Sequence, residues 1–178
     1  GENQLLEAHT LNGGQLRIGA SDMTLQFFLL PFLEQFHQQF PNIKVNVSNA
    51  PTPETIESLT EGRIDFGVVT TPVEAGKGIR QIPVLPFRNV FIAGKRFEYL
   101  KGKELDYTVL SGLPCIFLEK NTSTRTFMDR FLEEHSIRLT PEFELAISDM
   151  VVQFAKRNMG VGCVMEGFAR EALERGEV

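Results

Sequence analysis

Residues 14–71 have the sequence GQLRIGASDMTLQFFLLPFLEQFHQQFPNIKVNVSNAPTPETIESLTEGRIDFGVVTT. Three apolar runs in it, residues 15–20, 43–48 and 64–69, predict strands, and the segments between them predict helices. Each predicted strand runs into a polar turn that contains hydroxyl side chains. Alternating strands and helices form parallel sheets, and ligands of open α/β sheets bind beside the carboxyl ends of the strands. This stretch therefore predicts a small-molecule site.

The helices between these strands have recognisable boundaries. In the first helix, Leu25, Phe28, Phe32, Phe36 and Phe40 recur at spacings of three or four and form one apolar stripe, which is either core or dimer surface. Pro31 falls inside this helix and predicts either a kink or the start of a second helical segment. The second helix is predicted to have Thr52 as its N-cap and Pro53 as its first residue, and to end at Gly62.

The remainder of the chain continues the alternation. Strands are predicted at residues 79–85, 90–93, 115–118, 143–147 and 161–165. A helix is predicted at residues 125–135, with Phe127, Phe131 and Leu132 facing inward. A second helix is predicted to start at a cap formed by Ser148 and Asp149 and to end at Gly160, and a third to start at Phe168. Residues 2–10 predict a helical tail that Asn12, Gly13 and Gly14 end. The fold class is therefore α/β, with a largely parallel sheet in each half.

The composition and net charge of the chain argue against some classes of function. The 178 residues carry a net charge of −5, which argues against broad contact with nucleic acid. No apolar run approaches the ~20 residues that span a bilayer, and residues 1–12 lack the pattern of a signal peptide. We therefore expect a cytoplasmic protein with no membrane partner.

The sequence contains no recognisable catalytic or metal-binding motif. Cys115 and Cys163 lie in apolar runs and are expected to be buried free thiols, and the three histidines have no metal-ligand spacing. Nucleophile-elbow, phosphate-loop and zinc-protease motifs are absent from the sequence. Asp22 and Glu119 could form a carboxylate pair, but nothing local would separate their pKa values. We expect no catalytic residue, no metal and no cofactor.

Hydroxyl and amide side chains gather in four turns, around Ser21 and Thr24, at Thr52, at Thr70 and Thr71, and from Asn121 to Ser123. A helix N-terminus has unpaired N–H groups and a partial positive charge, so such a turn could bind a carboxylate or sulfate. Helix capping is the alternative explanation for any single turn. Four such turns at strand ends favour a binding site for a small anion.

Several motifs, in this order, resemble the effector-binding domain of LysR-type transcriptional regulators. They are Gly14 to Ser21, Leu30-Pro31, Phe36 with Phe40 to Ile43, Leu59 with Glu61 to Val68, and Arg157 to Met165. The resemblance covers nearly the whole chain. The family usually has proline where this chain has Met165.

The resemblance implies a fold of two Rossmann-like α/β subdomains joined by two crossover strands, like that of type 2 periplasmic binding proteins. It implies that residues 1–13 are the end of a linker helix. Subdomain I would be discontinuous, with residues 14–87 and 163–178, and subdomain II would comprise residues 88–162.

The resemblance also implies a function, the sensing of a small polar or anionic metabolite in the cleft between the subdomains. By position, the expected effector contacts are Ser21, Asp22, Met23, Thr24, Thr52, Thr70, Thr71, Glu119, Asn121, Thr122 and Ser123. DNA would be bound only through an N-terminal winged helix-turn-helix that this sequence does not contain. The alternatives are an extracytoplasmic solute-binding receptor and an enzyme built on the same scaffold.

A homodimer, or a tetramer at full length, is the implied assembly. In the family, the first helix of one subunit packs near a second-subdomain helix of its partner, here residues 25–40 and 125–135. Both helices are rich in phenylalanine, and adjacent Phe27 and Phe28 cannot both face one core. The sequence therefore supports an apolar contact between copies of the chain.

Overall fold

The computed structural model describes residues 14–178. The chain forms two compact units, the first ending at Leu85 and the second comprising Pro86–Val178. The predicted tail helix at residues 2–10 lies outside the described residues. Among the residues that are described, no helix is both long enough and apolar enough to cross a bilayer.

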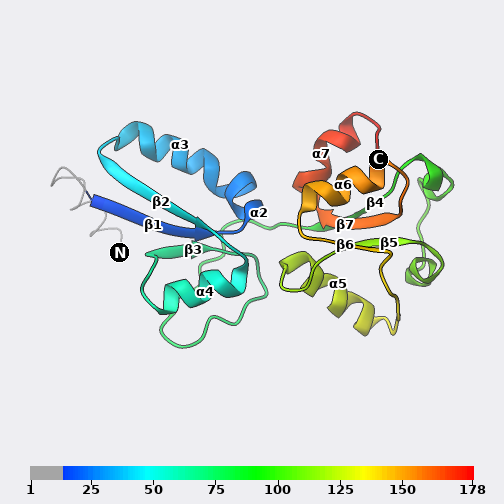
Figure 1. The fold of residues 1–178 in the computed structure, drawn as a ribbon, viewed down its shortest axis with the longest axis horizontal. Coiled ribbons are helices and arrows are strands. Elements are labelled where there is room, and N and C mark those ends of the chain that lie inside the picture. Colours follow the sequence, from blue (N-terminus) through cyan, green and yellow to red (C-terminus); the bar gives the residue numbers. More distant parts are fainter. Residues whose placement is uncertain (1–13) are drawn as a thin grey trace. The chain divides into compact units, whose positions relative to one another are not determined.

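The first unit contains a three-stranded parallel sheet (Figure 1). Its strands are β1 (Gly14–Ala20), β2 (Ile43–Asn49) and β3 (Phe66–Val68), in the order β2-β1-β3. Ala20 is the register partner of both Asn49 and Val68, so the carboxyl ends of all three strands lie at one edge. The order reverses at β1, and in α/β sheets ligands bind at this kind of switch point.

The first helix is continuous but not regular. It begins as α2 (Asp22–Thr24), widens to a π-helical segment (Leu25–Leu29) and continues as α3 (Leu30–Gln39). Pro31 is the second residue of α3, and the π-helical segment ends two residues before it, so the irregular turn lies where proline removes a helical hydrogen bond. The predicted apolar stripe is therefore displaced, because a π turn rotates the residues that follow it. Phe32, predicted to lie in the core or at a dimer surface, is 55% exposed, whereas Leu29 is buried.

Helix α4 (Thr52–Thr60) lies unusually close to the sheet. Gly19 and Gly67 are register partners on β1 and β3, and together they leave a part of the sheet surface that no side chain of their own covers. The Cγ2 atom of buried Thr55 fills it, only 2.9 and 2.7 Å from where a Cβ on either glycine would stand. The predicted cap at Thr52 is wrong, because the helix begins at Thr52 itself and Pro51 holds the N-cap position.

The second unit contains a four-stranded mixed sheet in the order β4-β7-β5-β6. Its strands are β4 (Asn89–Ile92), β5 (Cys115–Leu118), β6 (Phe143–Leu145) and β7 (Val161–Met165). Only β4 runs antiparallel to its neighbour. The helices are α5 (Ser123–Glu134), α6 (Ser148–Lys156) and α7 (Glu166–Glu174), and two 3-10 helices occupy Lys95–Leu100 and Tyr107–Gly112.

The two units repeat one design. Strands β1, β2 and β3 lie in the order β2-β1-β3, and strands β5, β6 and β7 lie in the equivalent order β6-β5-β7. In each unit the first of these strands is central, and a helix begins shortly after it ends. The turns after Ala20 and after Leu118 are therefore structurally equivalent, and each lies at the switch point of its sheet.

Residues 163–178 belong to the second unit, not to the first as expected. Strand β7 pairs with β4 and β5, Val178 packs against the core formed by Val151 and Ala155, and Lys156 forms an ion pair with Glu177. Between residues 14 and 178 the chain passes between the units once, at Leu85 and Pro86, so a second crossover strand is not seen there.

Other expectations in the second half also need correction. No strand forms at residues 79–85, where Ile82, Val84 and Leu85 are exposed. Ser148 is the first residue of α6 and not its cap, and the helix ends at Lys156, before Gly160. On α5, Met128 and Leu132 face the core, whereas Phe127 is 42% exposed.

Candidate functional site

The carboxyl edge of the first sheet brings together the predicted polar residues of the first unit. Ser21 and Asp22 follow β1, Thr52 starts the helix after β2, and Thr70 and Thr71 follow β3. Ala20, Asn49 and Val68 are in register at this edge, which explains why segments far apart in sequence meet. The sequence therefore located this edge correctly.

Thr24 ties two of these strand ends together. Its hydroxyl donates to the carbonyl of Val68 at 2.8 Å and accepts from the N–H of Ser21 at 3.0 Å. The N–H of Thr24 in turn donates to the hydroxyl of Ser21 at 3.3 Å, which completes a reciprocal cap. Thr24 is 1% exposed and Met23 is also buried, so the protein itself covers the side chains of these two expected effector contacts.

Asn49 belongs to this edge, although the sequence analysis did not single it out. Its side-chain amide donates to the carboxylate of Asp22, and both residues are exposed. The signal that could have identified Asn49 is its place at the end of a strand, the criterion already applied to Ser21 and Thr70. The edge therefore presents the amide of Asn49 from β2 and, from the turn after β1, the carboxylate of Asp22 and the hydroxyl of Ser21.

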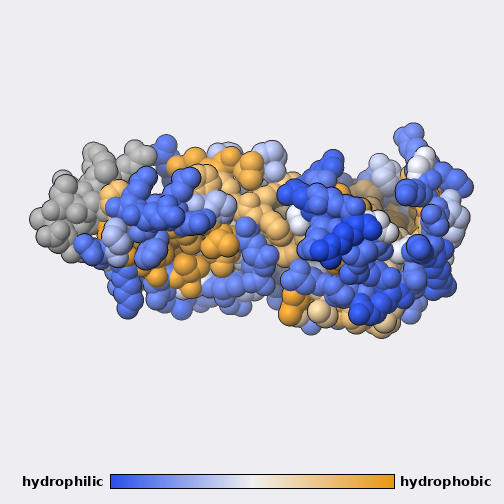
Figure 2. Space-filling model, turned by 90° about the horizontal axis from the view of Figure 1, so that it is seen from above, coloured by the Kyte–Doolittle hydropathy of each residue, from blue (hydrophilic) through white to orange (hydrophobic). Residues whose placement is uncertain are grey.

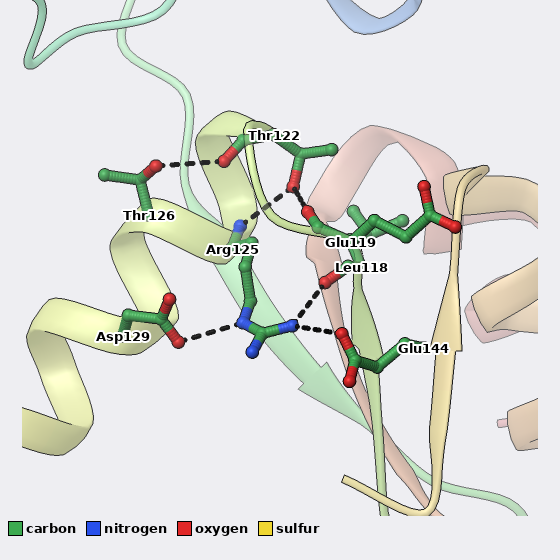
Figure 3. Close-up of polar contacts among 7 residues, drawn as sticks. All are labelled: Leu118, Glu119, Thr122, Arg125, Thr126, Asp129 and Glu144. Atoms are coloured by element: carbon green, nitrogen blue, oxygen red, sulfur yellow. Dashed lines mark hydrogen bonds and ion pairs between the residues drawn. The ribbon is translucent and has the colours of Figure 1, made fainter.

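The equivalent turn of the second unit contains the other predicted residues, Glu119 and Asn121 to Ser123 (Figure 3). The hydroxyl of Thr122 caps α5 by accepting from the N–H of Arg125 at 3.1 Å, and donates to the carbonyl of Glu119 at 2.9 Å. Asn121 has a φ of 77°, a left-handed conformation that asparagine tolerates well. Glu119 and Asn121 are exposed, whereas Thr122 and Ser123 are half-buried.

Arg125 is buried beneath this turn. Arg125 is not among the site residues predicted from the sequence. Burial lowers the pKa of its guanidinium, but hydrogen bonds and charge attraction from Asp129 and Glu144 raise it by more, so Arg125 stays charged. The sequence gives no signal for this, because an arginine in the first turn of a helix is normally a solvent-exposed residue.

A further polar contact lies at the same edge of the second sheet. The hydroxyl of Thr124 donates to the side-chain oxygen of Asn89 at 2.8 Å. Asn89 begins β4 and is the register partner of Met165, so it lies at the carboxyl end of β7. The antiparallel direction of β4 was not expected, and Asn89 was therefore missed.

The thiols and acidic groups offer little chemistry. Cys115 and Cys163 are free and buried, and burial raises the pKa of Cys115 to about 11 and that of Cys163 to about 12. Within residues 14–178, no group of three or more histidine, cysteine, aspartate or glutamate side chains could hold a metal ion. What the two edges can do chemically is donate and accept hydrogen bonds.

Comparison with known proteins identifies the family. The family model described as the LysR substrate binding domain matches residues 9–178. The chain belongs to the LysR substrate-binding domain family. Its sheets have the α/β architecture of that family, and the type 2 periplasmic-binding-protein-like fold inferred from the sequence is confirmed.

LysR-type regulators are also the relatives of this domain. The uncharacterized HTH-type transcriptional regulator YeiE of Escherichia coli is 21% identical over 165 residues, which are 93% of this chain and 56% of YeiE. The chain thus spans little more than half the length of this relative. Proteins of this kind are transcriptional regulators, in agreement with the family expected from the sequence.

Solved structures of LysR regulatory domains share the fold. The regulatory domain of Synechocystis CcmR in complex with 2-PG superposes with a TM-score of 0.77 at 21% identity, covering 88% of this chain and 74% of that one. The effector-binding domain of QuiR in complex with shikimate gives 0.74 at 15% identity, covering 86% and 74%. These LysR domains bind small molecules.

Proposed function

We propose that this chain is the effector-sensing regulatory domain of a DNA-binding transcriptional regulator, and that its effector is a small polar or anionic metabolite. The observation that supports this most directly is the first sheet, whose three strands end at one edge in polar turns. The turns offer hydroxyl and amide groups and the N-terminus of the nine-residue helix α4. The domain has a sensing function and not an enzymatic one.

The expected contacts in the first unit are Ser21, Asp22, Thr52, Thr70 and Thr71, with Asn49 added. Those in the second unit are Glu119 and Asn121 to Ser123. Shikimate and 2-PG, found in two structural neighbours, are small, polar ligands of the kind this edge could hold. They are suitable first probes together with inorganic sulfate.

A thermal-shift screen with these probes tests the site. A ligand at a hundredfold excess over its dissociation constant should stabilise the protein by ~2.7 kcal/mol. Thr52→Ala and Thr70→Ala should abolish the shift, whereas Thr60→Ala should keep it. Thr60 is a matched control because its exposed hydroxyl donates only to the carbonyl of Ile56, at the far end of the same helix. A shift that survives both site substitutions would show that the ligand binds elsewhere.

The role in transcription belongs to the whole protein, which we propose is a cytoplasmic regulator that contacts DNA through a helix-turn-helix segment outside this chain. The net charge of −5 supports the separation, since DNA contact needs a basic surface. In a gel-shift assay with the promoter DNA of the regulator's own gene, the full-length protein should retard the DNA, and residues 14–178 should not. Retardation by the domain alone would overturn this assignment.

We also propose a homodimer formed through the two phenylalanine-rich helices. Figure 2 shows apolar side chains on the surface of the first unit, where Leu30 and Phe32 of α3 are 54% and 55% exposed. On α5, exposed Phe127 stacks on Phe131, and Tyr107 and His135 extend the same aromatic cluster. Exposed apolar patches of this kind typically mark interaction sites.

Sedimentation velocity at micromolar concentration tests the dimer. The wild type should sediment as a dimer, and Phe32→Glu should sediment as a monomer. Leu173→Glu provides the control, because Leu173 is similarly exposed at 44% but lies on α7. A single monomeric wild-type species at all concentrations would exclude the dimer.

A further inference from the structure

Arg125 is a buried charge with an unusual number of partners. Its side chain is 9% exposed, although it lies in the first turn of α5. A buried charge is costly unless it is paired and hydrogen-bonded, so the ion pairs and hydrogen bonds of Arg125 offset the cost of its burial.

The guanidinium of Arg125 links three elements of the second unit (Figure 3). Its Nε atom donates to Asp129 on α5 at 2.9 Å, and its Nη1 atom donates to Glu144 on β6 at 3.0 Å. The same Nη1 atom donates to the carbonyl of Leu118, the last residue of β5, at 3.0 Å. The guanidinium also lies 5.3 Å from the centre of the Phe117 ring.

These contacts hold both ends of the turn that follows β5. Its first end is fixed where Leu118 accepts from Arg125 and where the N–H of Glu119 donates to Leu145 at 2.9 Å. Its second end is fixed by the N–H of Arg125, which donates to Thr122, and Thr122 donates back to Glu119. The turn is thus closed by a ring of hydrogen bonds in which Arg125 takes part through both its main chain and its side chain.

We propose that Arg125 is a positioning residue that holds the turn at residues 119–123 in its binding geometry before any effector is present. The inference deepens the proposed function, because it rests on this turn contacting the effector. A lysine could not replace Arg125, since one ammonium nitrogen cannot reach Asp129, Glu144 and Leu118 in the fixed fork that a guanidinium provides.

Amide hydrogen exchange of the ligand-free protein tests the inference without knowledge of the effector. In Arg125→Lys, the amides of residues 119 and 125, which donate to Leu145 and Thr122, should exchange at least ten times faster than in the wild type, while those of β7 change less than twofold. Arg130→Lys is the matched control, because Arg130 is an exposed arginine on the same helix, and its exchange pattern should equal that of the wild type.

The pattern of exchange decides between positioning and general stability. Equal acceleration across β5, β6 and β7 would mean that Arg125 only stabilises the unit, and unchanged exchange in the turn would mean that it holds nothing; either result overturns the inference. If Arg125→Lys does not fold, Glu144→Gln serves instead. The side chain of Glu144 is 50% exposed, and the glutamine amide of the variant has the same shape as the carboxylate that it replaces. This variant should accelerate exchange of the same turn at least threefold, and unchanged exchange would again overturn the inference.

Titration with shikimate, 2-PG and sulfate separates this inference from the proposed function. If the wild type binds a probe, Arg125→Lys should weaken it at least tenfold, and unchanged affinity would overturn the positioning role. If the wild type binds none of them, the proposed choice of ligands fails, and the exchange experiment alone still decides whether the turn is preformed.

Discussion

Replacement of Thr24 by valine removes one hydroxyl from the first unit while keeping the shape of the side chain. The buried hydrogen bond to the carbonyl of Val68 is lost, which costs about 1–3 kcal/mol when an acceptor remains buried. The N–H of Ser21 also loses its acceptor, the Thr24 hydroxyl, which costs about 1 kcal/mol, whereas the bond from the N–H of residue 24 to the Ser21 hydroxyl remains. The free energy of unfolding should therefore fall by about 3 kcal/mol in total.

Urea denaturation followed by far-UV circular dichroism measures this loss. With a urea slope of about 1–3 kcal/mol per molar, the midpoint should fall by at least about 1 M. Thr60→Val is the control, because its exposed hydroxyl bonds only within α4 and the change should stay within about 0.5 kcal/mol. Hydrogen exchange of Thr24→Val should also accelerate at residues 21–25 and 68–71. A free energy of unfolding of Thr24→Val within about 0.5 kcal/mol of the wild-type value would refute the role assigned to Thr24.

Three further predictions concern packing, charge and thiol chemistry. Gly67→Ala should destabilise the protein by about 1–3 kcal/mol, because the new Cβ would stand 2.7 Å from the Cγ2 atom of Thr55. In denaturation experiments, adding Thr55→Ser should restore part of the lost stability, and Gly112→Ala should cost far less because the space around Gly112 is open. The N–H and guanidinium of Arg17 hold the pKa of Asp65 below its usual value, so this carboxylate stabilises the fold above the unfolded pKa, and the benefit disappears as pH falls through the folded pKa. Asp65→Asn should therefore be less stable than the wild type at pH 7, and acid titrations should show the difference shrinking as pH falls through the folded pKa of Asp65. With thiol pKa values of about 11 and 12, Cys115 and Cys163 stay protonated at pH 8. A thiol-reactive disulfide should therefore label neither cysteine in the native protein and both in denaturant, and rapid labelling of the native protein would contradict their burial.

Local patterns predicted the elements whose burial is simple. Strand β5 is buried at all four positions and strand β7 at all five, and both were predicted within the observed bounds because continuous apolar runs have few alternatives. The polar edge of the first sheet was also predictable, since parallel strands must end together. These successes depend on periodicity and on chain direction alone.

The errors arise where neighbours in space override the local pattern. Regular spacing left core and dimer surface open for Phe32, and the π-helical segment before it determines that this side chain is exposed in the single chain. Residues 79–85 have the composition of a strand but pair with no strand among the described residues. The role of Arg125 depends on Glu144, nineteen positions later in sequence, a contact that no local pattern reveals.

The sequence separation of the two units has a consequence for synthesis of the chain on the ribosome. All three strands of the first sheet end by Val68, and the first strand of the second sheet begins at Asn89. At about 5–20 residues per second, the first sheet can pair within seconds and without competition from the apolar strands β5 and β7. The order of translation thus lets the first sheet form before the fully buried strands β5 and β7 have been synthesised.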